Sequence, residues 1–130
     1  MKKSRMILPL IFLLAISLGA CSRTPADDPA KNVAAYWQAL IKQDAARLSS
    51  LSCAAYESTA LTTMESFQSV EVVIHDLTCV TADASTDSAT VNCTGSIVAS
   101  YGAEDLTIDL STRSYNVVKE NGEWRMCGEK

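Results

Sequence analysis

The chain has 130 residues, with 11 Lys and Arg against 15 Asp and Glu, and three of the cations stand within the first five positions. The rest of the chain therefore carries 8 cations and 15 acids, a formal net charge of −7. So acidic a chain lacks the basic face that nucleic acid or an anionic lipid surface requires, which argues against both classes of partner. Its length fits one domain with a single core of modest size.

The chain opens with a basic stretch at residues 2–5 and an apolar run at residues 6–18. This run is too short to cross a bilayer as a permanent helix and is typical of a secretory signal. It ends in Leu-Gly-Ala-Cys at residues 18–21, which resembles the lipobox of bacterial lipoproteins. The resemblance implies that residues 1–20 are a signal peptide and that Cys21 becomes the lipidated N-terminus. An ordinary secretory signal with an incidental cysteine is the alternative.

A lipidated Cys21 would hold the domain at the cell envelope, on the extracytoplasmic side of a membrane, because several acyl chains anchor stably. Residues 21–29 hold two prolines and two aspartates without an apolar pattern, so we interpret them as the lipidated cysteine and a short tether. Ser22 stands where Asp would favour retention at the inner membrane. By resemblance to lipoprotein sorting rules, this favours the outer membrane in a cell that has one.

Two helical segments are predicted next. The first runs to about residue 50, with Asp27 or Asp28 as its N-cap and Pro29 in its first turn. Its apolar residues recur at helical spacing and are Val33, Trp37, Leu40, Ile41, Leu48 and Leu51. Gln43-Asp44 is a point where it could break into two. Residues 54–68 repeat the helical spacing, although three threonines weaken the helix propensity.

From residue 70 the apolar period switches to two, which predicts strands at residues 70–81, 89–101, 106–119 and 123–127. Asn121-Gly122 predicts a type I′ turn between the last two strands. This turn would place Lys119 opposite Trp124, Val117 opposite Met126, and Asn116 opposite Cys127. The apolar phase shifts near Arg113, which indicates a bulge there.

Apart from Cys21 the chain has four cysteines, and disulfides are expected of an even number in an oxidising compartment. No pair has CxxC spacing and the chain has one histidine, so a zinc site or a redox motif has little support, and we expect no metal or cofactor. If the first hairpin is symmetric about Thr86, Cys79 lies opposite Cys93. That leaves Cys53 for Cys127, although the other two connectivities stay open.

The predicted order of elements, helices followed by a meander of long strands, resembles that of the nuclear transport factor 2-like, or cystatin-like cone, superfamily. Residues 33–48, 88–96 and 121–128 resemble the first helices, the central strand and the closing hairpin of small bacterial lipoproteins in it. The resemblance implies an α+β domain at residues 30–130, with N-terminal helices packed on a curved antiparallel sheet of about four strands. The resemblance says little about activity, because enzymes, transport adaptors and lipoproteins all have this fold.

Enzymes of this superfamily place polar groups in the cavity between helices and sheet, and the candidates here are His75, Asp76, Tyr101, Asp109, Arg113 and Tyr115. His75 and Asp76 are neighbours on a strand, so their side chains point to opposite faces and cannot form a dyad. Asp109 is expected in solvent, since strict alternation puts it on the polar face. Trp37 and Trp124 are expected in the core.

Arg113 is the best candidate for a cationic pocket group, because a bulge re-aims side chains. Together with His75 and Tyr115 it makes up the possible pocket, against the alternatives of a surface arginine and an exposed strand histidine. Glu104-Asp105 lacks the alternating oxygen ligands of a calcium loop, so a solvated turn is expected there.

The sequence shows no acid–base or nucleophile constellation. We therefore expect a non-catalytic envelope lipoprotein that binds a small ligand or a protein. An isomerase or hydratase that uses the helix–sheet cavity is the alternative, and a purely structural envelope protein is the third hypothesis. The resemblance also allows a homodimer through the sheet.

Overall fold

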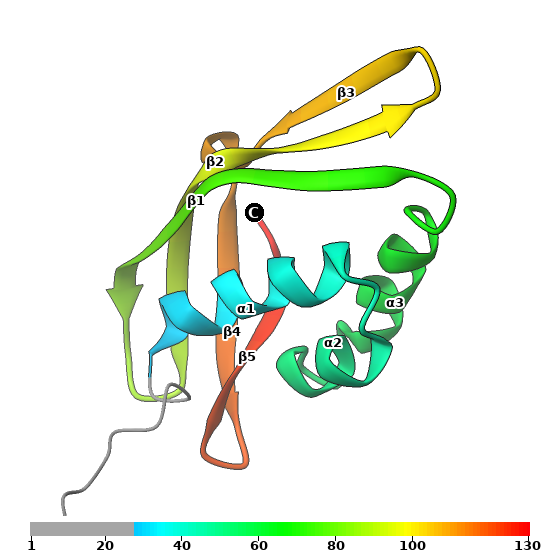
Figure 1. Cartoon of the computed structure of the whole chain (residues 1–130). Coiled ribbons are helices and arrows are strands. Elements are labelled where there is room, and N and C mark those ends of the chain that lie inside the picture. Colours follow the sequence, from blue (N-terminus) through cyan, green and yellow to red (C-terminus); the bar gives the residue numbers. More distant parts are fainter. Residues whose placement is uncertain (1–27) are drawn as a thin grey trace, which may run out of the picture.

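The computed structural model of this protein describes residues 28–130, so the expected signal peptide, the lipidated Cys21 and nearly all of the tether lie outside the described residues. Three helices precede five strands: α1 (Pro29–Ile41), α2 (Ala45–Leu51), α3 (Glu57–Glu65), β1 (Glu71–Ala84), β2 (Ser88–Tyr101), β3 (Glu104–Asp109), β4 (Ser114–Glu120) and β5 (Glu123–Glu129). The predicted α+β class is confirmed, with the helices packed on an antiparallel sheet (Figure 1). None of the described helices is long and apolar enough to cross a membrane.

The first helix begins where the sequence predicts. The Asp28 carboxylate accepts a hydrogen bond from the amide of Ala30 at 3.0 Å, and Pro29 occupies the first helical position. Such a cap satisfies an amide that has no partner within the helix, and proline has no amide to satisfy there. Asp28, of the two candidates, is thus the cap.

The predicted break at Gln43-Asp44 is also confirmed. Gln43 takes a φ of 55°, and the Asp44 carboxylate then caps α2 by accepting a hydrogen bond from the amide of Arg47 at 3.0 Å. The third helix is shorter than the predicted residues 54–68, since its N-cap position holds Tyr56, whose side chain makes no capping hydrogen bond.

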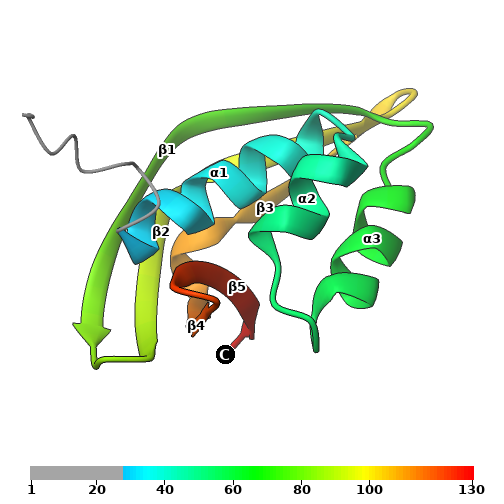
Figure 2. The ribbon, with the colours of Figure 1, turned by 90° about the horizontal axis from the view of Figure 1, so that it is seen from below.

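Strand β2 is the centre of the sheet. It pairs with β1 along one edge, while its other edge is shared by β4, at residues 88–92, and β3, at residues 96–101. Strand β5 pairs with the far side of β4. The sheet curves around α1, as the view from below shows (Figure 2).

The single strand predicted at residues 106–119 is wrong, because a short 3-10 helix, η2 (Leu110–Thr112), divides it into β3 and β4. Asp109 starts this turn by accepting hydrogen bonds from the amide of Ser111 at 2.8 Å and from its hydroxyl at 2.7 Å. The change of apolar phase near Arg113 is thus real, but its cause is a 3-10 turn in place of the predicted bulge. The turn also places Leu110 in the core, where it is fully buried.

Strand β1 contains a bulge that the sequence pattern did not predict. The register with β2 shifts between His75 and Thr78, where Asp76 has a φ of 51° and the facing Gly95 a φ of 105°. Leu77 is half-buried after the shift, as Ile74 is before it, so the residues facing the helices change from even to odd numbers. The bulge thereby keeps a long, bent strand in contact with the core.

The closing hairpin has the predicted turn but departs from the predicted register after Met126. Asn121 and Gly122 have φ values of 52° and 79°, and the pairs Lys119–Trp124 and Val117–Met126 form as predicted. The predicted pairing of Asn116 with Cys127 is wrong, because the register shifts and Tyr115 pairs with Glu129. Gly128, with a φ of 125°, takes up the extra residue.

Two disulfides join Cys53 to Cys127 and Cys79 to Cys93, with Cα–Cα distances of 5.2 and 4.0 Å, which is the pairing that hairpin symmetry predicted. The first bond spans 74 residues and fixes the segment between α2 and α3 to β5. On a chain-entropy model such a loop stabilises the fold by about 4 kcal/mol. The amide of Cys53 also donates to the carbonyl of Met126 at 2.8 Å.

We expect Gly95→Ala to lower the free energy of unfolding by roughly 2–4 kcal/mol. A Cβ at this position would lie 2.5 Å from the carbonyl oxygen of His75 and 2.7 Å from that of Asp76. Gly102→Ala is the matched control, since Gly102 also has a positive φ of 71° but open space around it, and should cost about 1 kcal/mol. Urea unfolding measures both, and equal losses would contradict the clash.

Candidate functional site

Of the three predicted pocket residues, Arg113 lies near Tyr115, whereas His75 lies apart from both. His75 is exposed and shares a row across the sheet with Ser96 and Asp109, at a distance from Asp109 of two strand spacings, roughly 10 Å. Arg113 is exposed and binds Glu129, whereas Tyr115 is fully buried. His75 therefore shares no site with Arg113 and Tyr115, and a binding role for these two stays a prediction.

Tyr115 instead belongs to an aromatic cluster that links helices and sheet. Ring centroids of Tyr56 and Tyr36 lie 6.4 Å apart, those of Tyr36 and Trp37 5.7 Å, and those of Trp37 and Tyr115 5.8 Å, the last two edge to face. Edge-to-face contacts of this kind are favourable beyond the apolar area that they bury. The prediction that Trp37 is a core residue is confirmed, and Trp124, 8% exposed, is likewise buried.

Burial decides the protonation of this cluster. It raises the pKa of Tyr36 well above its usual value, and the neighbouring Tyr56 adds to the shift. Burial and then the Glu129 carboxylate raise the pKa of Tyr115 to about 12 and also raise that of Tyr56. All three phenols stay neutral near pH 7, so they can donate hydrogen bonds, as Tyr115 does to the carbonyl of Leu110 at 3.4 Å, but do not act as general bases.

Arg113 lies at the rim of this cluster. Its Nη1 is 2.6 Å from Oε2 of Glu129, with side chains 47% and 29% exposed. An exposed pair of this kind contributes little to stability, but it neutralises the charge that a cationic pocket group would need. Sequence reasoning missed Glu129 as the partner, since the two residues meet only through the shifted register of β5.

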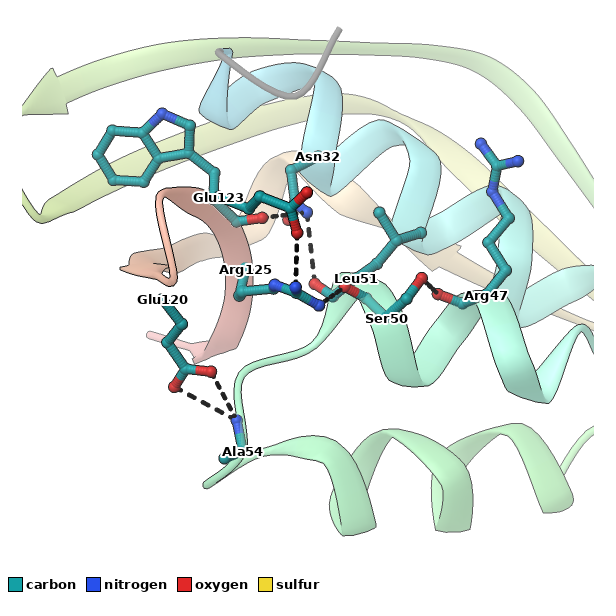
Figure 3. A network of polar contacts seen from close by, with 9 residues as sticks. Asn32, Arg47, Ser50, Leu51, Ala54, Glu120, Glu123 and Arg125 are labelled. Atoms are coloured by element: carbon teal, nitrogen blue, oxygen red, sulfur yellow. Dashed lines mark hydrogen bonds and ion pairs between the residues drawn. The ribbon is translucent and has the colours of Figure 1, made fainter. Parts of the chain in front are cut away.

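A second polar network joins α1, α2 and β5 (Figure 3). The Asn32 amide donates to the carbonyl of Trp124 at 2.7 Å and to that of Leu51 at 3.4 Å. Arg125 donates to the carbonyl of Ser50 and to the carboxylate of Glu123, so its cation lies near the C-terminal end of α2, where the helix dipole favours it. This network holds elements in place and offers no reactive group.

In the part of the chain that the structure describes, hollows on the helical surface include none of the predicted pocket residues. One, of about 370 Å³, is lined by Ala35, Gln38, Ala39, Lys42, Asp44 and Arg47. The other, of about 440 Å³ and widely open, is lined by Ser58, Thr59, Thr62, Thr63 and Ser66. In residues 28–130, no three His, Cys, Asp or Glu side chains gather as ligands for a metal ion.

The raised pKa of Tyr115 makes stability depend on alkaline pH. A tyrosine in the unfolded chain ionises near pH 10, so between about pH 10 and 12 the folded state binds more protons. The stabilisation is complete below pH 10 and is lost as the pH rises through 12. Tyr115→Phe should therefore flatten the fall in the free energy of unfolding across this range, measured by urea unfolding. A slope equal to that of the wild type would contradict the assignment.

No family model and no curated protein matches this chain. Among solved structures, a SEC-C motif containing protein from Rhodopseudomonas palustris is similar, with a TM-score of 0.57 at 11% identity over 83% of this chain and 80% of that one. The helical cell shape determining protein Pgp2 from Campylobacter jejuni is similar with a TM-score of 0.51 at 8% identity, over 77% of this chain but 38% of that protein. At these identities the likenesses show the fold alone, an α+β domain of the nuclear transport factor 2-like type.

Proposed function

We propose that this protein is a lipid-anchored envelope protein whose domain binds another protein outside the cytoplasm. The observation that carries the proposal is the pair of disulfides, which indicate an oxidising, extracytoplasmic compartment. The lipobox-like residues 18–21 supply the means of attachment, with Cys21 as the acylated residue.

The packing of the domain supports binding at its surface. The space between α1 and the sheet is occupied by fully buried side chains, among them Leu40, Val91, Ile97, Val117 and Met126. The phenols that border this core are held neutral, and the nearby Arg113 is paired. These features favour a binding role over acid–base chemistry on a small substrate.

The uncovered face of the sheet supports a protein as the ligand. Helices cover one face, and on the opposite face Val73 and Val80 are 42% and 57% exposed. A sheet face with apolar side chains flanked by polar ones is the type of surface that a protein partner covers.

The anchor is tested with Cys21→Ser. Cells fed an alkyne-labelled fatty acid should incorporate the label into the wild-type protein and into a Ser22→Asp control, but not into Cys21→Ser. The wild type should sediment with membranes, and Cys21→Ser should be released because it lacks acyl chains. An unlabelled wild type would refute the anchor.

Binding is tested in the same cells with a photo-crosslinking residue at Val73. We expect a discrete protein adduct from Val73 and none from Ser58, an exposed position on α3. Native mass spectrometry of the purified protein gives the complementary measurement. A bound mass that is lost on denaturation, without an adduct at Val73, would refute protein binding in favour of a small ligand.

A further inference from the structure

The charges of this protein are segregated. No Lys or Arg occurs between Arg47 and Arg113, whereas this interval contains nine Asp and Glu. It comprises α3, β1, β2 and β3. The two ion pairs of the described residues, Arg113–Glu129 and Arg125–Glu123, both lie outside it. None of the nine carboxylates of this interval forms an ion pair within residues 28–130.

The exposed apolar residues lie on the same strands. Four large apolar side chains of the described chain are strongly exposed, and all belong to β1, β2 or β3: Val73, Val80, Tyr101 and Leu106. The end of β2 and the start of β3 extend away from the helices (Figure 1). On this projecting part, Tyr101 is 50% and Leu106 52% exposed. Acidic and exposed apolar side chains therefore occur on the same strands.

Strand β3 has a free edge. It pairs with β2 on one side, and no strand of residues 28–130 pairs with its other side. Asp105 and Asp109 alternate along it with Leu106 and Ile108, and since side chains of a strand alternate between faces, the carboxylates lie on one face and the apolar groups on the other. A free edge with unpaired backbone groups accepts an additional strand.

Charge decides which strand can be added. A second copy of β3, paired antiparallel, would bring Asp109 beside Glu104 or Asp105 of the other copy, and such like-charge contacts protect edges from self-association. The same carboxylates attract a cationic strand. Hydrogen bonds from Ser111 lower the pKa of Asp109, so this group stays ionised at neutral pH.

We propose that the free edge of β3 binds an extended segment of a partner protein in which Lys or Arg alternates with apolar residues. This inference rests on the proposed protein-binding role and names the surface and the partner chemistry. Cationic side chains of the segment lie beside Asp105 and Asp109, and its apolar side chains cover Leu106 and Ile108. Backbone pairing supplies affinity, and the alternation supplies selectivity.

The test uses the full-length protein in detergent and a synthetic peptide of alternating Lys and Val. Hydrogen exchange should slow at residues 104–109 when the peptide is added, because new backbone pairing protects the outward amides. A peptide of alternating Glu and Val should not bind. A peptide with the same Lys and Val in two blocks should bind on the order of tenfold more weakly, since it cannot match both faces.

Charge reversal locates the site. Glu104→Lys/Asp105→Lys should weaken the alternating peptide on the order of tenfold, measured by fluorescence anisotropy at physiological salt. Asp83→Lys/Asp87→Lys is the matched control, because it changes the net charge equally at the β1–β2 turn, which lies at the other end of β2 from residues 104–105. This control should leave the affinity nearly unchanged, because the length of β2 exceeds the distance over which salt screens charges.

Three outcomes would overturn the inference: equal binding of the block peptide, equal weakening by both variants, or protection at β1 or β5 in place of β3. Protection of residues 104–109 that rises with protein concentration, without peptide, would identify a second copy as the occupant and also overturn it. If the protein is lipidated and crosslinks at Val73 but does not bind the peptide, the inference about β3 is refuted and the proposed function is not. If the wild-type protein binds the peptide but shows neither the fatty-acid label nor an adduct at Val73, the proposed function is refuted instead.

Discussion

The packing of α1 into the concave sheet is the contact on which the other elements depend. Its stripe of Val33, Tyr36, Trp37 and Leu40 is almost completely buried. In a flat sheet, the outer strands could not reach the same helix. The bulge at Asp76 and the 3-10 turn after β3 provide the curvature that lets several strands contact α1. The Asn32 bond to β5 then fixes how α1 lies within the sheet.

Local patterns predicted the parts of the fold that local chemistry determines. The cap at Asp28, the break before Asp44 and the Asn121-Gly122 turn each depend on residues adjacent in the chain. The facing cysteines of the first hairpin follow from counting outward from Thr86. Such features need no knowledge of distant partners.

What the sequence left undetermined depends on distant pairing. Alternation tells which face a residue occupies but not which strand lies beside it, so the phase change near Arg113 could not distinguish a bulge from a 3-10 turn. The partner of Arg113, Glu129, depends on an extra residue at Gly128 in another strand. Of the candidate site, Tyr115 was found as a residue, whereas its buried aromatic surroundings emerge only from the fold.

The bond between Cys53 and Cys127 also determines how the domain carries force. Tension applied between the start of α1 and β5 passes through two helices and one covalent bridge, while β1 to β4 lie in a closed loop outside this path. Peeling β5 away cannot lengthen the molecule by the 74 residues that the loop encloses. A domain held at its N-terminus would therefore resist unravelling from its far end, and its sheet would stay folded under a pull that broke only weaker contacts.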